Sequence, residues 1–145
     1  MKPVVVVDAS VSIKWFVPAL PEEADVPDAL GLLQAYAEDR LELYQPSIWR
    51  AEVLAVLARV SPSSAARQAA HLFSFDHELA DSEAIYRKAM ELSIELNHHL
   101  FDTIYHAAAL LHPNAVFVTA DDRYRAKGAR LGRILALPLW RNILH

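Results

Sequence analysis

Apolar and polar residues alternate along the chain in blocks that predict strands and helices by turns. The block Val4–Val7 is a continuous β-branched run, as expected for a strand that is buried on both faces. Ser47 and Ser82 each precede a periodic apolar stretch and are expected helix N-caps. The pattern predicts strands at 4–7, 41–44, 78–80, 116–119 and 134–137. It predicts helices at 10–16, 27 or 28 to 38, 48–59, 63–73, 82–96, 101–111 and 122–131.

This alternation of strands and helices favours a three-layer α/β/α fold around a mainly parallel central sheet. The length of 145 residues suits a single domain, 1–145, and we see no repeat, low-complexity tract or flexible linker that would divide it. In sheets of this kind, ligands bind beyond the carboxyl ends of the strands. The residues that directly follow each strand are therefore the first candidates for function.

Two of the predicted strands are followed by aspartates. Asp8 follows Val4–Val7, and Asp121 and Asp122 follow the strand at 116–119. If these strands are parallel neighbours, Asp8 and Asp121 approach each other at one edge of the sheet. Each could instead be only the N-cap of the helix that follows it. Of the neighbouring pair, we expect Asp122 to be the cap and Asp121 to face the site.

Two more carboxylates lie on predicted helices that could cover this edge. Glu52 shares a helix side with Ile48, Ala55 and Val56, where a carboxylate is costly unless a cation or hydrogen-bond donors satisfy it. A structural ion pair of Glu52 with Arg50 or Arg59 is the alternative. Asp102 opens the helix at 101–111, and its alternative role is a favourable first-turn charge at the helix dipole.

Taken together, Asp8, Glu52, Asp102 and Asp121 predict a metal site. Carboxylates that crowd together repel one another, so without a cation one of them would have to take a proton. Ligands that are all oxygen atoms select a hard cation, which favours Mg²⁺, with Mn²⁺ as a possible substitute. Such a site suits the hydrolysis of phosphodiester bonds. We find no Gly-rich phosphate-binding loop and expect no nucleotide cofactor.

Composition narrows the class of protein further. Apolar residues make up 54% of the chain, which allows a substantial core. The absence of cysteine excludes a disulfide scaffold, a thiolate zinc site and a cysteine nucleophile. The valine run is too short for a signal peptide, and no apolar stretch approaches the length of a membrane span. We expect a cytoplasmic protein that does not enter a membrane.

The charge distribution leaves two interpretations open. The net charge of -4 argues mildly against simple electrostatic binding of nucleic acid. No acidic residue follows Asp122, whereas that last segment carries several cations, which form either a solvated helix face or a patch that meets RNA phosphates. These cations are Arg123, Arg125, Lys127, Arg130, Arg133 and Arg141.

Four segments resemble the motifs of a known family, the PIN domains, and within it the VapC-type toxins of toxin–antitoxin pairs. The resemblance covers nearly the whole chain in order and length, and its first and fourth motifs are the more specific. The motifs are Val5–Phe16 around Asp8, Pro46–Leu54 around Glu52, Phe101–Ala109 around Asp102, and Val118–Arg123 around Asp121.

The resemblance implies a Mg²⁺-dependent endoribonuclease that leaves a 5′-phosphate and a 3′-hydroxyl. It also implies a homodimer that a small cognate antitoxin holds inactive. By the same resemblance, Asp8, Asp102 and Asp121 would bind the catalytic metal, and Glu52 would help or hold a second ion. Ser10 and Thr119 fall where hydroxyl groups of the family orient carboxylates or water. The chain departs from the family at Ala55, where such toxins often carry Asn, and at His106, a position that is commonly apolar.

Other residues invite a functional role without requiring one. We expect His98, His99 and His106 to lie on the surface or at helix ends, although His106 could border the site. Lys14 and Arg123 could contact an RNA backbone. Trp15, Phe16 and Trp49 are expected in the core or at a dimer contact. Two rival functions are a catalytically silent protein-binding module and a metal-dependent nuclease or phosphatase acting on DNA or small phosphate esters.

Overall fold

A five-stranded parallel sheet forms the centre of the structure, a computed structural model that describes residues 1–17 and 24–144. Its strand order is β3-β2-β1-β4-β5, and every neighbouring pair is parallel. The expected mainly parallel sheet is therefore confirmed, and the predicted strands are present within a residue or so. The strands are β1 (Val4–Val7), β2 (Glu42–Gln45), β3 (Glu78–Leu79), β4 (Ala115–Thr119) and β5 (Ile134–Ala136).

The predicted helices are also present, with small shifts at their ends. The helix expected to open at Ser63 starts two residues later, at Ala65, and the helix expected to run to Leu131 ends at Gly128 and tightens into a 3₁₀ turn. The final 3₁₀ helix was not predicted. No helix of the described ranges is long and apolar enough to cross a membrane. The helices are α1 (Ala9–Phe16), α2 (Val26–Ala37), α3 (Ile48–Val60), α4 (Ala65–Phe73), α5 (Glu83–Leu96), α6 (Leu100–Leu111), α7 (Asp122–Gly128), η1 (Ala129–Leu131) and η2 (Leu137–Leu144).

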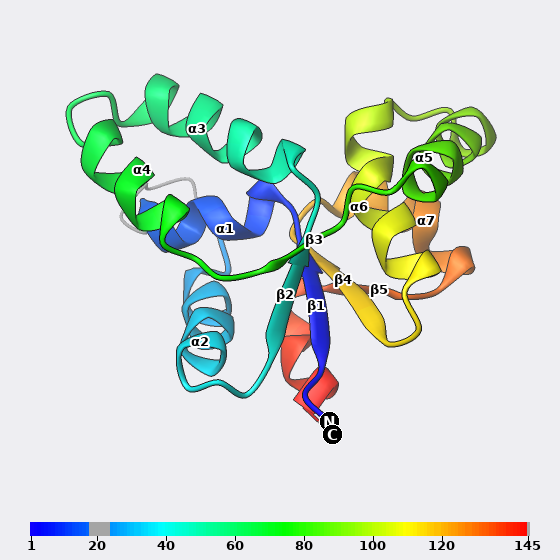
Figure 1. Cartoon of the computed structure of the whole chain (residues 1–145), viewed down its shortest axis with the longest axis horizontal. Helices are drawn as coiled ribbons and strands as arrows, with labels where there is room; N and C mark the ends of the chain where they lie inside the picture. Colours follow the sequence, from blue (N-terminus) through cyan, green and yellow to red (C-terminus); the bar gives the residue numbers. More distant parts are fainter. Residues whose placement is uncertain (18–23, 145) are drawn as a thin grey trace.

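Helices cover the sheet from both sides (Figure 1). Helices α1 to α4 lie to one side of the view and α5 to α7 to the other, which is the expected three-layer arrangement. The four valines of β1 are buried, as expected for the central strand. Trp15, Phe16 and Trp49 are buried in the core, where Trp15 donates to the carbonyl oxygen of Ala29 at 2.8 Å. Their role as core residues is thus confirmed.

The strand order places the switch in chain direction at β1, whose carboxyl end is the expected position of a ligand. From β1 the chain first builds β2 and β3 on one side and then returns to build β4 and β5 on the other, so β1 adjoins the switch in direction. Asp8 follows β1, and Asp121 follows the neighbouring β4. The sheet therefore brings both aspartates to the same edge.

The side chain of Gln45 extends the pairing of β1 and β2 at this edge. Backbone partners are Val4 with Glu42 and Val5 with Leu43. Beyond them, the carboxamide of Gln45 accepts from the N–H of Val7 at 2.8 Å and donates to its carbonyl oxygen at 2.7 Å. Gln45 is fully buried, so both backbone groups of the residue before Asp8 are satisfied without water.

Candidate functional site

Asp8 is held by two hydroxyl groups from different elements. Ser10 Oγ donates to Asp8 Oδ1, and Thr119 Oγ1 donates to Asp8 Oδ2 at 2.7 Å. The register that pairs Val7 with Val118 places Thr119 beside Asp8. Asp8 starts α1, but its carboxylate makes no capping hydrogen bond to that helix. Asp8 therefore does not act as a side-chain N-cap of α1, which was its alternative role.

Asp121 lies next to Asp8 and does cap a helix. Its Oδ1 accepts from the N–H of Tyr124 at 3.0 Å, and its own N–H donates to Thr119 Oγ1 at 3.0 Å. The expectation that Asp122 is the cap is wrong, because Asp122 is the first residue of α7 and its exposed carboxylate pairs with Arg125 at 3.3 Å. Capping occupies one oxygen of Asp121 and leaves the other open towards the sheet edge.

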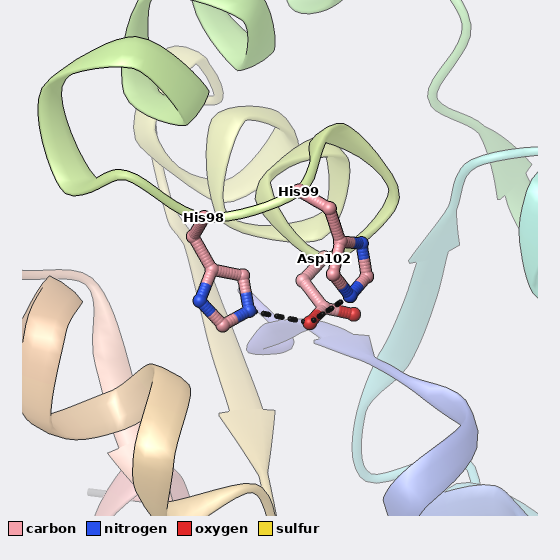
Figure 2. Close-up of side chains that lie close together, drawn as sticks. All are labelled: His98, His99 and Asp102. Atoms are coloured by element: carbon pink, nitrogen blue, oxygen red, sulfur yellow. Dashed lines mark hydrogen bonds and ion pairs between the residues drawn. The ribbon is translucent and has the colours of Figure 1, made fainter.

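Asp102 lies in the first turn of α6 and is contacted by two histidines (Figure 2). His98 Nε2 is 2.6 Å and His99 Nε2 is 3.1 Å from the same oxygen, Oδ2. We expected these histidines to lie on the surface or at a helix end, and both lie at the start of α6: His99 is its exposed N-cap, and His98 comes just before it. Because neither lies inside the helix, both side chains can reach one carboxylate, and their imidazole rings stack 5.1 Å apart.

Glu52 is satisfied by a tyrosine rather than by an arginine. Tyr105 Oη donates to Glu52 Oε1, and burial together with Glu52 raises the pKa of Tyr105 above its ordinary value. Arg50 instead donates to the backbone oxygens of Phe73 and Phe75. The helix side that carries Glu52 does not face the core, because the buried residues of α3 are Trp49, Val53 and Leu57. Tyr105 is three residues after Asp102 on α6, and this spacing is the signal that could have identified it.

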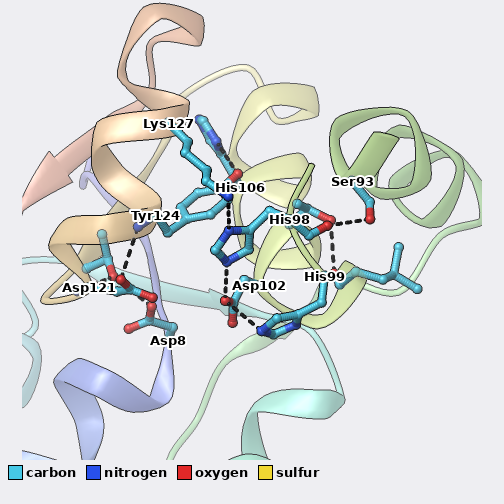
Figure 3. Close-up of polar contacts among 12 residues, drawn as sticks. Asp8, Ser93, His98, His99, Asp102, His106, Asp121, Tyr124 and Lys127 are labelled. Carbon is cyan, nitrogen blue, oxygen red and sulfur yellow. Dashed lines mark hydrogen bonds and ion pairs between the residues drawn. The ribbon is translucent and has the colours of Figure 1, made fainter. Parts of the chain in front are cut away.

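The carboxylates influence one another at the sheet edge, where Figure 3 shows Asp8, Asp102 and Asp121. Burial raises the pKa of Asp8 to about 6, and the charges of Asp102 and Asp121 add to the rise against the two hydroxyl donors. Burial also raises the pKa of Glu52, with a further contribution from Asp102. No lysine or arginine within residues 1–17 and 24–144 forms an ion pair with Asp8, Glu52 or Asp121. Hydrogen bonds from Ser10 and Thr119 satisfy Asp8, His98 and His99 contact Asp102, and His99 acts against the rise in the pKa of Glu52.

The four carboxylates lie less close together than the sequence suggested. In the described part of the chain, a single group of three His, Asp or Glu side chains has ligand atoms within 4.8 Å of one another, namely His98, His99 and Asp102. Opposite ligands of one Mg²⁺ lie about 4.2 Å apart, because each Mg–O bond is about 2.1 Å long. Mg²⁺ usually takes only one or two carboxylates and keeps several waters. An ion at this edge could take one or two of the carboxylates directly and contact the others through water.

The basic C-terminal segment is mostly engaged within the protein. Arg133 donates to the backbone oxygens of His112, Pro113 and Ala115. The others make ion pairs or backbone contacts: Arg125 with Asp122, Lys127 with Asn97, Arg130 with Glu95, and Arg141 with Asp28. Arg123 is exposed. Most of these side chains therefore do not form a continuous phosphate-binding patch.

His106 is fully buried, which corrects the expectation of a surface or helix-end residue. Its Nε2 faces the carbonyl oxygen of Gly132 at 2.8 Å, and its Nδ1 faces Tyr124 Oη at 2.8 Å. Because a carbonyl only accepts, Nε2 carries the hydrogen and Nδ1 accepts from Tyr124. Burial lowers the pKa of His106. His106 therefore joins α6 to α7 behind the carboxylates instead of bordering them.

A pocket of about 530 Å³ lies at the opposite edge of the sheet, away from the carboxylates. Lys2, Tyr36, Glu42 and Glu78 are among its lining residues, all near the amino-terminal ends of β1, β2 and β3. This pocket is spacious, but its titratable lining residues do not form a buried cluster. The carboxyl edge is the better candidate site, because the pKa of Asp8 there is raised and further acids lie nearby.

Two solved structures are similar to this chain over nearly their full length. One is a toxin–antitoxin complex from Klebsiella pneumoniae, with a TM-score of 0.67 and 19% identity over 92% of this chain and 97% of that chain. The other is VapBC2 from Rickettsia felis bound to a DNA fragment from their promoter, with a TM-score of 0.63 and 16% identity over 92% of this chain and 96% of that chain. At these identities the likeness establishes the fold.

Comparison at the level of sequence gives the family. No curated protein matches the chain significantly. The model of the PIN domain family matches residues 5–129, a range that contains all four carboxylates and both hydroxyl residues around Asp8. The chain therefore belongs to the PIN domain family.

Proposed function

We propose that this protein is a Mg²⁺-dependent endoribonuclease and the toxin of a toxin–antitoxin pair. PIN domains are nucleases, so the hydrolysis of phosphodiester bonds is the class of activity that the family supports. The observation that carries the proposal is the partly buried carboxylate of Asp8, whose pKa is raised by desolvation and by the charges of Asp102 and Asp121. A divalent ion at this edge would relieve that cost.

The residues that would hold the ion are Asp8, Asp102 and Asp121, with Glu52 acting through water or at a second ion. All their ligand atoms are oxygens, a donor set that suits Mg²⁺ and also Mn²⁺. The bound ion would supply the Lewis-acid chemistry that phosphodiester hydrolysis requires. No cation of the described residues already neutralises Asp8, Glu52 or Asp121, which leaves this charge available.

The surrounding side chains hold the carboxylates in place. Ser10 and Thr119 fix both oxygens of Asp8, and Ser10 Oγ also accepts from the N–H of Ala120 at 3.0 Å, which ties the start of α1 to the end of β4. Tyr105 fixes Glu52. This support keeps the acids oriented before an ion or substrate arrives, so little reorganisation is needed during the reaction.

RNA as substrate and an antitoxin as partner are the finer parts of the proposal. They are supported by the motifs around Asp8 and Asp121 and by the likeness to structures described as toxin–antitoxin complexes. The proposal includes a homodimer and a cytoplasmic location. Exposed Arg123 lies two residues after Asp121, at the start of α7, and is the candidate for contact with a substrate phosphate.

The test is cleavage of a labelled single-stranded RNA by purified protein in Mg²⁺ and in EDTA. We expect cleavage only with Mg²⁺, and a loss of at least about 100-fold in Asp8→Asn and Asp121→Asn, as for removal of a metal-binding group. Asp76→Asn, which neutralises an exposed carboxylate away from the site, is the matched control and should cleave normally. A DNA of the same sequence and a phosphomonoester complete the panel.

Each alternative result contradicts a defined part of the proposal. Cleavage of DNA or of the monoester in preference to RNA would place the substrate elsewhere while keeping the metal site. A protein that binds RNA or a partner but neither cleaves nor responds to Mg²⁺ would be a silent binding module. Equal activity of Asp8→Asn and wild type would remove the carboxylates from the mechanism.

A further inference from the structure

Asp102 is connected to helix α7 through the imidazole of His98. Lys127 Nζ lies 3.2 Å from His98 Nδ1, and His98 Nε2 lies 2.6 Å from Asp102 Oδ2. Lys127 Nζ also donates to the carbonyl oxygen of Asn97 at 2.9 Å. Figure 3 shows the three side chains in sequence from α7 to the carboxylate at the start of α6. The first two residues of this chain of contacts, Lys127 and His98, belong to no motif that the sequence pointed to.

The ammonium group determines which nitrogen of His98 carries the hydrogen. Lysine offers three donors and no acceptor, so Nδ1 must accept from Lys127. The hydrogen of the imidazole is then on Nε2, which donates it to Asp102. A hydrogen on Nδ1 would instead point at the positive charge of Lys127. The pair of contacts therefore selects one neutral tautomer.

The imidazole is fixed in this position by its surroundings. The side chain of His98 is only 8% exposed, and the ring meets the ring of Tyr124 edge-on with centroids 5.0 Å apart. Ser93 Oγ donates to the backbone oxygen of His98 and so holds the segment that leads into α6. Tyr124 is also the residue whose N–H is capped by Asp121. His98 thus contacts one proposed metal-binding aspartate directly and packs on the tyrosine whose N–H another one accepts.

We propose that His98 and Lys127 are positioning residues for Asp102, an inference that rests on the proposed function. The Nε2–H of His98 occupies Oδ2, so Oδ1 is the oxygen that Asp102 directs at the ion. A histidine or other donor behind a ligand commonly fixes its orientation in metal sites. Lys127 acts one step further away, by holding His98 in the donating tautomer. One cation of the basic C-terminal segment thereby has an inward role.

The same atoms could be interpreted as a transition-metal site made of His98, His99 and Asp102 (Figure 2). Their ligand atoms lie within 4.8 Å of one another, and two imidazoles with one carboxylate suit Zn²⁺ better than Mg²⁺. Binding through Nε2 would require His98 to carry its hydrogen on Nδ1, which faces the ammonium of Lys127. The contact of Lys127 therefore opposes this interpretation, and the test below decides between the two.

The first measurement is the ¹⁵N chemical shifts of the imidazole of His98 in metal-free protein labelled at histidine. We expect the pattern of the tautomer with hydrogen on Nε2 in wild type, and loss of that preference in Lys127→Met. Lys88→Met, which removes a lysine from the surface of α5, is the control. A hydrogen on Nδ1 in wild type would overturn the inference, whatever the activity of the protein.

The second measurement is the affinity for Mn²⁺, followed by electron paramagnetic resonance of the free ion, and for Mg²⁺ by competition. We expect His98→Phe to weaken binding by about 10- to 100-fold, as for loss of a residue that supports a metal ligand. His98→Gln keeps a donor and should recover part of the affinity. His71→Phe, on exposed α4, is the control and should bind as wild type does.

The outcomes separate this inference from the proposed function. Wild-type affinity in His98→Phe would overturn the positioning role while leaving the nuclease proposal intact. A wild-type protein that binds no Mn²⁺ would contradict the proposed function, and the tautomer would still be read from the spectrum. Tight binding of Zn²⁺ that His98→Phe and His99→Ala each abolish would establish the transition-metal site in place of the positioning role.

Discussion

Neutralising Asp8 should stabilise the metal-free protein, because the folded state holds this carboxylate at a cost. Burial raises the pKa of Asp8 from 3.8 to about 6, with a further rise from Asp102 and Asp121. Above pH 6 the carboxylate is charged in both states, and the folded state is the one that opposes the charge. Asp8→Asn keeps the shape of the side chain and removes that charge.

The size of the effect follows from the shift in pKa. A rise of about two units corresponds to about 3 kcal/mol, since each unit is worth about 1.4 kcal/mol. Asp8 retains some contact with solvent, so we expect Asp8→Asn to gain about 1–3 kcal/mol at pH 7.5. As the pH falls from 6 towards 4, wild-type Asp8 takes up a proton in the folded state first. The folded protein is relieved of the charge, and the difference from Asp8→Asn shrinks.

The assay is urea denaturation of both proteins in EDTA at pH 7.5 and pH 4, repeated at pH 7.5 with Mg²⁺. Mg²⁺ should stabilise wild type more than Asp8→Asn and so reduce or reverse the difference. Asp76→Asn, an exposed neutralisation, should change stability by less than about 0.5 kcal/mol. If Asp8→Asn is clearly less stable than wild type in EDTA at pH 7.5, the reasoning about a costly carboxylate is wrong.

Three further predictions concern the residues that support the site. Gln45→Met should lower the free energy of unfolding by about 2–4 kcal/mol in urea denaturation, because both backbone groups of Val7 lose a buried partner, whereas an unchanged value would contradict the role of the carboxamide. Gly128→Ala should lower stability by about 1–3 kcal/mol despite the usual gain of alanine in a helix, because the new Cβ would lie 3.0 Å from a His106 ring held at both nitrogens; a raised melting temperature would refute this. In the Asp8→Asn background, stability should fall as the pH drops below 6.5, because the unfolded chain protonates its imidazole while burial lowers the pKa of His106; a profile unaltered by His106→Gln would refute that assignment.

The sequence predicted the elements well and the contacts between them poorly. The valine run of β1 and the strand before Asp121 are local patterns, and parallel pairing then brings their ends together. Gln45 could not be identified in this way, because its role depends on where β1 and β2 stop pairing through the backbone. The apolar pattern predicts where a strand lies, but not the residue at which its backbone pairing with a neighbouring strand ends.

The surroundings of the carboxylates were the least predictable part. His98 and Lys127 act through contacts between different elements, which periodicity does not encode, whereas the spacing of Tyr105 from Asp102 on α6 was a usable signal. For the basic C-terminal segment, the sequence left open either a solvated helix face or a patch that meets RNA phosphates. In the structure, Arg133 and Lys127 donate hydrogen bonds to backbone oxygens of the protein itself. The composition of a segment does not determine which way each side chain points.

The location of a bound ion is the most direct test of the whole account. In crystals soaked in Mn²⁺, an anomalous difference map would show the position of the bound ion. We predict a peak at the carboxyl edge of the sheet, with oxygens of Asp8, Asp102 or Asp121 in its coordination shell and none of the imidazole nitrogens. A peak ligated by His98 and His99, or no peak beside Asp8 at saturating Mn²⁺, would contradict it.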